Sequence, residues 1–331
     1  MLEILKKNWF VVLIAILLCG FSIYYVWDTT KDYVKGKSVD GKDLIASIDG
    51  NNLTADDLYD EMSRFSISQL YYRFRNAVIE QSVTEETDEM KEAAQELRKN
   101  LEAQAQSSSS SSADELIANL LTSVGMEEDE LDRFCMLAQK ENVLQVNYAK
   151  EHYDELLKDV EKAHIISLIE ISVSDASSLS DDEKATKEAI DQALADGTSF
   201  ADVASEYSQS TLTDDKGFYG YIDEEASSTT TFTDDMIDAA LALKEGETSK
   251  WVNVDSDSGD KIVLIYADIA GKDSLKESDQ SDVWSALVSA LVARESTLSS
   301  EILFDAADQL NITFADETLE SRLRIYAGLD E

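Results

Sequence analysis

An uncharged apolar segment near the N-terminus is the strongest constraint on how this chain folds. It spans residues 9–27, WFVVLIAILLCGFSIYYVW. As a helix rising ~1.5 Å per residue, it reaches just under the ~30 Å hydrocarbon core of a bilayer. Aromatic residues stand at both ends, Trp9 at one and Trp27 with two tyrosines at the other, as in aromatic belts. We therefore predict a transmembrane helix over residues 1–27, which contacts the membrane through residues 9–27.

The flanks of this segment indicate an uncleaved signal anchor. Lys6 and Lys7 precede it, as in a signal peptide. Leu18 stands before Cys19, where lipidation needs a small residue, and no A-x-A cleavage site follows. An N-terminal span with a very short head usually sends the rest of the chain outward. We expect a single-pass protein of the cell membrane whose bulk is extracytoplasmic, with residues 28–43 as a polar stalk.

Charge and the few reactive side chains exclude several classes of function. The 331 residues carry a formal net charge of −40, which disfavours nucleic acid because phosphate binding needs Lys and Arg. Two histidines and two cysteines form no zinc-ligand pattern, and no Ser-His-Asp arrangement or phosphate loop is visible. The stretch DSDSGD at 255–260 lacks the spaced Glu of a calcium loop. We therefore expect neither a metal nor an organic cofactor.

Helical patterns fill both ends of the chain. A short apolar strand over 44–48 precedes a turn, after which Thr54 is expected to cap a helix. Residues 57–106 are helix-like, and a flexible serine run at 107–112 ends them. Asp114 opens another apolar helix in ELIANLLTSVG, and residues 127–162 follow as one or two long helices. Residues 281–310 are helix-like again. The segment that follows, NITFADETLESRL, is expected to close the chain with a short strand and a turn.

The middle of the chain predicts a compact unit with the order β-α-α-β-α-β-β. Strand and helix patterns alternate along it with glycines at the breaks. Its parts are a strand at 163–174, two helices around Gly197 in 181–208, a strand at 217–222, a helix at 233–250 and a pair of strands in 251–269. The two helical flanks can pack together with this unit as an insert, so the predicted fold class is α+β.

The motifs of this middle unit resemble the parvulin family of peptidyl-prolyl cis/trans isomerases. They are AHII, GTSFADVASEYS, GFYGYI, AALALKEGETS and KIVLI, in this order over about 163–270. The surrounding helices, with the opening ASIDGNNLTADDLYDEM, are similar to extracytoplasmic foldases of the PrsA and SurA kind. In those proteins, a helical chaperone domain built from both chain ends carries parvulin units.

This resemblance implies a division of the chain into five parts. They are a signal anchor over 1–27, a stalk over 28–43, the first part of a helical chaperone domain over 44–162, a parvulin-like domain over 163–272, and a C-terminal helical part over 273–331 that packs on the chaperone domain. Its partners would be unfolded or newly exported polypeptides, and the chain would act alone or as a homodimer.

The resemblance also assigns candidate site residues. His164 matches the first of the family's paired histidines, and Lys261 falls where the second is expected. Ser210 takes the place of a Cys or Asp in the active-site loop, and Ser258 matches a Ser or Thr in the strand turn. Each residue also has a plain structural interpretation: His164 as a buried polar group, Ser210 as a turn cap, and Lys261 as a solvated strand residue.

Four further residues match positions of the family that shape the site. Phe232 and Met236 fall where apolar side chains line the cup for the proline ring, although they suit an ordinary core equally well. Gly217 and Gly220 match a Gly-x-x-Gly turn, where glycine permits a positive φ. These glycines indicate the fold more than the activity.

The departures from the family leave the activity open. Prolyl isomerisation breaks no covalent bond, so an enzyme needs only to bind the twisted amide better than the planar one. Lys261 has three donors and no acceptor, and therefore cannot replace a neutral imidazole. Ser210 can still donate one hydrogen bond. The loop after the first strand, SVSDASSLSDDEKATK, has no basic cluster, which argues against phosphoproline substrates.

Three functions follow from these observations. The first is a membrane-anchored extracytoplasmic foldase that binds clients and isomerises X–Pro bonds, an activity that is weak or absent if the substituted site is impaired. The second is a non-catalytic holdase whose parvulin unit is a degenerate binding module. The third is an anchored scaffold for a membrane partner. His164 and the apolar cup favour the first, whereas Lys261 and Ser210 favour the second.

Overall fold

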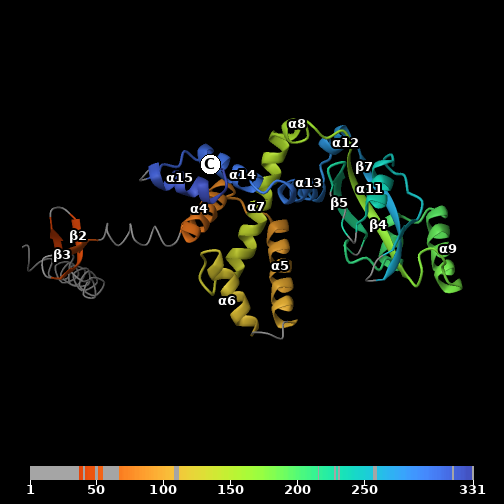
Figure 1. Ribbon diagram of the computed structural model, residues 1–331, viewed down its shortest axis with the longest axis horizontal. Coiled ribbons are helices and arrows are strands. Elements are labelled where there is room, and N and C mark those ends of the chain that lie inside the picture. The colour runs from red at the N-terminus through yellow and green to blue at the C-terminus, as the bar shows by residue number, and fades with distance from the viewer. Residues whose placement is uncertain are drawn as a thin grey trace, which may run out of the picture. The chain divides into compact units, whose positions relative to one another are not determined.

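In the computed structural model the chain forms two compact units, Met1–Ile67 and Ser68–Glu331 (Figure 1). The predicted membrane segment and most of the stalk lie outside the described residues. Within the part of the chain that the structure describes, no helix is both long enough and apolar enough to cross a membrane. The described residues are 37–39, 42–48, 51–54, 67–107, 112–214, 216–226, 229, 232–255, 259–314 and 317–329.

The first unit contains a three-stranded antiparallel sheet in the order β1-β2-β3. Its strands are β1 (Lys37–Val39), β2 (Lys42–Ile48) and β3 (Asn51–Thr54). The stalk predicted for 28–43 therefore includes β1 and the start of β2. Thr54 lies in β3 and pairs with Leu44 of β2. The helix that Thr54 was expected to cap lies outside the described residues.

Helices from both ends of the chain share one hydrophobic core in the second unit. The N-terminal set is α4 (Ile67–Ser82), α5 (Asp88–Ser107), α6 (Ala113–Ser123), α7 (Leu131–Glu151) and α8 (Tyr153–Leu156). The C-terminal set is α12 (Lys272–Lys276), α13 (Ser281–Arg294), α14 (Leu298–Gln309) and α15 (Glu317–Tyr326). Val78 and Ile79 of α4 lie in the same buried cluster as Leu303 and Ala306 of α14. Burial of these apolar faces joins segments that are far apart in sequence.

The end of the chain differs from the sequence prediction. Residues 317–326 form α15 rather than a strand and a turn. Leu323 is buried, and Arg324 donates to Glu320 one helical turn earlier at 3.0 Å. The prediction was wrong because this short segment has a weak apolar pattern, and packing of its single buried face decides its structure.

The middle of the second unit has the predicted β-α-α-β-α-β-β order. Its elements are β4 (Ala163–Val173), α9 (Asp181–Ala195), α10 (Phe200–Tyr207), β5 (Phe218–Asp223), α11 (Asp234–Leu241), β6 (Val252–Val254) and β7 (Asp260–Ala270). The strands form one antiparallel sheet in the order β5-β4-β7-β6. The helix expected over 233–250 is shorter, since α11 ends at Leu241 and the chain then turns through Gly246 at φ +78°.

Alternation along β4 gives this sheet two apolar faces. Ile166 and Leu168 pack in the cluster that includes α11. Ile169 and Ile171 point the other way, into the cluster that includes α10. Because both faces are covered, nearly every residue of β4 is buried.

A third cluster joins the sheet to the helices of the flanks. Ile165 and Tyr221 of the sheet lie in it with Trp284 and Leu287 of α13. A buried polar group reinforces this junction. Asp223, 1% exposed, accepts hydrogen bonds from Tyr221 at 2.8 Å and from Arg294 of α13 at 2.8 and 3.0 Å. The sheet is therefore held against α13 by both apolar contacts and a charged pair.

Candidate functional site

A buried ion pair lies at the centre of the candidate site. Lys261 of β7 donates from Nζ to Oε2 of Glu170 on β4 at 2.8 Å. The two side chains are only 12% and 10% exposed. Ser172 is the register partner of Lys261, so Glu170 lies diagonally across the two strands on the same face. Leu168 and Glu170 are two residues apart on β4, so their side chains point to the same face of the sheet. Leu168 packs in the cluster that includes α11, and this face is therefore the one that α11 covers.

His164 does not take part in this pair, and its assignment as a catalytic residue stays a prediction. His164 stands six residues before Glu170 on β4, about 20 Å along an extended strand. Its register partner is Ala270, whereas Lys261 lies near the other end of β7. The residue that faces Lys261 is therefore Glu170.

The surroundings of His164 indicate a structural role. The side chain is buried, with Nε2 3.0 Å from the carbonyl oxygen of Leu243. Because that oxygen only accepts, Nε2 carries the proton. Nδ1 is buried and has no hydrogen-bond partner among the described residues. His164 thus ties β4 to the segment after α11, at a distance from the ion pair.

The loop that follows α10 is hydrogen-bonded to the backbone of β4 at Glu170. The backbone of Glu170 donates to Oγ of Ser208 at 3.2 Å and accepts from the backbone of Gln209 at 2.8 Å. The side chain of Gln209 accepts from the backbone of Ser172 at 3.1 Å. Ser210 follows in this loop, and its Oγ accepts from the backbone of Leu212 at 3.1 Å. The structure therefore brings the Ser210 loop to Glu170, with the hydroxyl of Ser210 acting as a turn acceptor.

The residues expected to line the proline cup are buried in the core. Phe232 is 4% exposed and Met236 is fully buried, both in the cluster under α11. The ring of Phe232 stacks on Tyr219, with centroids 4.5 Å apart and planes 13° apart. In this conformation neither residue presents a surface to a ligand. Ser258 lies outside the described residues, so its assignment stays a prediction.

The Gly-x-x-Gly turn is fixed by close packing. Gly217 has φ +86°, and a Cβ there would lie 2.8 Å from both the carbonyl oxygen of Leu168 and Cβ of Ala204. Gly220 has φ +121°, and its Cβ would lie 3.3 Å from Cβ of Ala286. Only glycine combines these backbone angles with such close neighbours. The turn therefore seats β5 and does not itself provide chemistry.

Glu170 is the site residue that the sequence analysis missed. The AHII motif lies at the start of the strand and indicates His164 as the site residue. A usable signal was present, because Glu170 is the single charged residue in the 11-residue strand AHIISLIEISV, whose other side chains are mostly apolar. A lone carboxylate in a buried strand needs a cationic partner, and Lys261 is the basic residue of β7.

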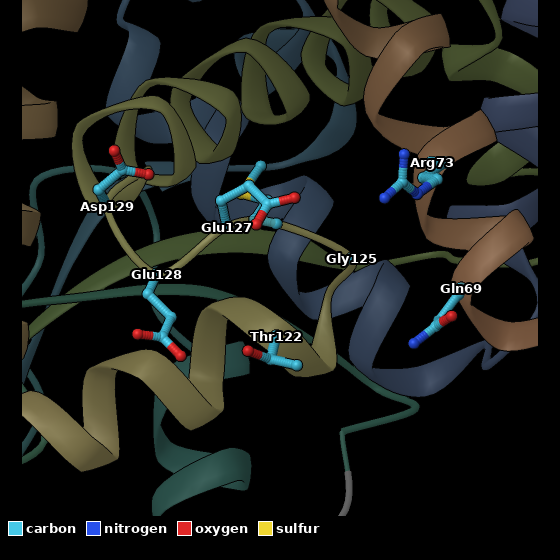
Figure 2. Close-up of a pocket in the computed structure, with 8 residues that line it drawn as sticks. Gln69, Arg73, Thr122, Gly125, Glu127, Glu128 and Asp129 are labelled. Atoms are coloured by element: carbon cyan, nitrogen blue, oxygen red, sulfur yellow. The ribbon is translucent and has the colours of Figure 1, made fainter. Parts of the chain in front are cut away.

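A hollow of about 550 Å³ lies among the flanking helices (Figure 2). Gln69 and Arg73 project into it from α4, opposite Glu127, Glu128 and Asp129 of the loop before α7. The three carboxylates do not converge on one point in this view. Among the described residues, no group of three or more His, Cys, Asp or Glu side chains is placed to hold a metal ion.

Comparisons with known proteins agree with the fold of the middle unit. A family described as "Rotamase: PPIC-type PPIASE domain" matches residues 164–266, which is less than half of the chain. The curated proteins contain no match. Among solved structures, the chain is similar to PrsA from Bacillus subtilis, at 19% identity and a TM-score of 0.45, over 85% of this chain and 98% of that one.

Another similar structure is the foldase protein PrsA from Streptococcus pneumoniae str. Canada MDR_19A. It has 15% identity and a TM-score of 0.38, over 84% of this chain and 97% of that one. The family match confirms that residues 164–266 resemble the parvulin-type peptidyl-prolyl isomerases, as their motifs predict.

Proposed function

We propose that this protein is a membrane-anchored extracytoplasmic foldase that binds unfolded or newly exported polypeptides and isomerises their X–Pro bonds. The observation that carries the proposal is the match of residues 164–266 to the PPIC-type isomerase domain. The anchor over 1–27 and the stalk over 28–43 belong to the proposal on the strength of the apolar segment 9–27.

The helical flanks are proposed to form the client-holding domain. Residues 44–162 and 273–331 would make up this domain, with 163–272 as the inserted isomerase unit. The shared core of α4, α7 and α14 supports this division, because helices from both chain ends bury their apolar faces together. Assembly as a homodimer stays a prediction.

The ion pair gives the site a means of favouring a twisted amide. Rotation about the C–N bond removes the amide conjugation, so electron density moves from the carbonyl oxygen back to the nitrogen. The ammonium of Lys261 has three donors, and of the described residues only Glu170 accepts from it. A donor held in a poorly solvated place by Glu170 stabilises such charge better than a solvated lysine does. Isomerisation would then rely on Lys261 rather than on paired histidines.

A non-catalytic holdase is the second candidate. It is favoured by the burial of Phe232 and Met236, which closes the expected proline cup. The same burial is compatible with catalysis only if the segment around Phe232 moves away when a client binds.

One experiment separates the two candidates. The full chain in detergent micelles is added to an Ala-Pro peptide, and the rate of cis/trans exchange of the peptide is measured by NMR. A second assay measures whether the same protein suppresses the aggregation of an unfolded client. Catalysed exchange with suppression supports the foldase. Suppression without catalysed exchange would overturn the isomerase proposal in favour of the holdase, and neither effect would refute both.

A further inference from the structure

A groove lies where the parvulin-like sheet meets the C-terminal flank. It has a volume of about 730 Å³, within the ~300–1,000 Å³ of ligand-binding pockets. Its lining comes mainly from the edge strand β5 and from α13. These two elements lie side by side (Figure 1). The lining residues are Asp214, Phe218, Tyr219, Gly220, Tyr221, Asp282, Ser285, Ala286, Ser289 and Ala290.

The chemistry of the lining favours a chain with apolar and basic side chains. On the β5 side, Phe218 and Tyr219 are only partly buried and offer aromatic surface. On the α13 side the residues besides Asp282 are alanine and serine, which leave room for an inserted chain. Asp214 and Asp282 contribute the only charges of the lining, which lies wholly in the described part of the chain, and neither Lys nor Arg is among them.

The walls of the groove are held at a fixed spacing. Gly220 packs so closely on Ala286 that a Cβ at Gly220 would lie 3.3 Å from the alanine methyl. The pair between Asp223 and Arg294 ties the two walls together farther along. Such a preformed groove loses little conformational entropy when it binds a chain.

Binding in this groove would not extend the sheet. Tyr219 is an extra residue in β5 relative to β4, which is a bulge that disfavours pairing at this edge. The backbone of Phe218 is already engaged, because its N–H donates to Oδ1 of Asp214 at 2.9 Å and its carbonyl accepts from the backbone of Asp214 at 3.3 Å. A bound chain would therefore be recognised through side chains.

Tyr219 connects the groove to the core of the isomerase unit. Tyr219 lines the groove, and its ring stacks on Phe232, a residue expected to line the proline cup. An occupant of the groove thus contacts a residue that supports the cup. This places the groove beside the site without overlapping the ion pair of Glu170 and Lys261.

We propose that the groove between β5 and α13 is a second client site, which binds an extended, unfolded polypeptide segment with basic and apolar side chains. Basic side chains would meet Asp214 and Asp282, and apolar side chains would pack on Phe218 and Tyr219. The formal net charge of −40 attracts such segments from a distance, and the groove gives them a place to dock. The proposal deepens the proposed function and rests on it, since it concerns the clients of the same foldase.

The test uses the full chain in detergent and a fluorescein-labelled, proline-free peptide of Lys, Ser and Phe. Binding is followed by fluorescence anisotropy. Asp282→Lys and Ser289→Trp, at exposed positions of α13, are expected to weaken binding about tenfold, by reversing a charge and by filling the groove. A peptide with Glu in place of Lys is expected not to bind.

Matched controls separate the groove from general charge attraction. Asp279→Lys makes the same change of charge just before α13, and Ser281→Trp adds the same side chain at an exposed position outside the lining. Both are expected to bind the basic peptide like the unaltered protein. Equal binding by Asp282→Lys and Asp279→Lys, or by Ser289→Trp and Ser281→Trp, would overturn the proposal.

Isomerisation of a short Ala-Pro peptide by the same proteins keeps this test apart from the proposed function. Loss of peptide binding with unchanged exchange supports a separate groove. If the unaltered protein catalyses no exchange but binds the peptide through Asp282, the isomerase proposal fails and the groove stands. If exchange is catalysed but the groove variants bind normally, the groove proposal fails alone.

Discussion

At the scale of single residues, the candidate site is distinguished by an ion pair between Glu170 and Lys261. The resemblance to parvulins implies two paired histidines, whereas this chain pairs Glu170 with Lys261, whose side chains are 10% and 12% exposed. A pair of this kind contributes little net stability, but each partner is costly to leave alone. The sequence identified Lys261 but not its partner, because partner choice depends on strand register, which the motifs did not determine.

The first prediction concerns this pair. Lys261→Met leaves the Glu170 carboxylate buried without its partner, and should lower the free energy of unfolding by ~3–5 kcal/mol. The double variant Glu170→Gln with Lys261→Met should recover most of the loss. Urea unfolding followed by circular dichroism measures both. Lys184→Met, which breaks a pair exposed at 57% and 105%, is the control and should change little. Equal effects of Lys261→Met and Lys184→Met would refute burial as the cause.

A second prediction at this scale concerns the glycine turn. Gly217→Ala and Gly197→Ala both place a Cβ at positive φ, which costs ~1 kcal/mol or more. Only Gly217 also has neighbours at 2.8 Å, whereas nothing lies within 4 Å of the Cβ at Gly197. Gly217→Ala should therefore destabilise the protein clearly more in thermal unfolding. Equal shifts of the two midpoints would show that close packing at Gly217 is unimportant.

At the scale of elements, local signals account for most of the middle unit. Ser180 and Glu183 form a capping box at the start of α9, and Gly197 separates α9 from α10, as the sequence indicates. The length of α11 was overestimated, because residues after Leu241 form backbone hydrogen bonds to β7 instead of continuing the helix. Such tertiary hydrogen bonds leave no periodic signal in the sequence.

The capping box gives a prediction with a defined pH dependence. Hydrogen bonds from the backbone of Ser180 and Ser174 lower the pKa of Glu183 to about 2. A lowered pKa means that the carboxylate stabilises the folded state above its unfolded pKa of ~4.3, and that this contribution is lost as the pH falls toward 2. Glu183→Gln should therefore lower stability at pH 7 and converge with the unaltered protein near that low pH.

The measurement is the urea midpoint as a function of pH. Glu188→Gln, an exposed carboxylate on the same helix, is the matched control and should follow the unaltered protein throughout. A constant difference between Glu183→Gln and the unaltered protein at all pH values would contradict the assigned role of the carboxylate.

At the scale of the whole molecule, the second unit is held together by contacts between distant segments. Helices near both chain ends share a core, and α13 joins that core to the sheet. The sequence predicted that the flanks pack together, but not the junction at Asp223 and Arg294. That pair combines a buried aspartate and an arginine separated by 71 positions, and no local pattern relates them.

Breaking this junction should loosen one region selectively. Arg294→Met leaves Asp223 with its bonds from Tyr221 and the backbone of Glu225 but without a cation. Amide hydrogen exchange should then become faster in β5 and α13 and stay unchanged in α9 and α10, because only the former elements meet at the junction. Arg98→Met on α5 is the control. Unchanged protection in β5 would show that apolar packing alone holds the sheet on α13.

We propose that this parvulin-like unit isomerises X–Pro bonds with a Glu170–Lys261 pair in place of paired histidines. The most direct measurement is NMR exchange of an Ala-Pro peptide with the full chain and with the double variant Glu170→Gln and Lys261→Met, after both are shown to be folded. We expect catalysed exchange by the unaltered protein and its loss in the double variant, while Lys244→Met retains it. Undiminished exchange in the double variant would contradict the claim.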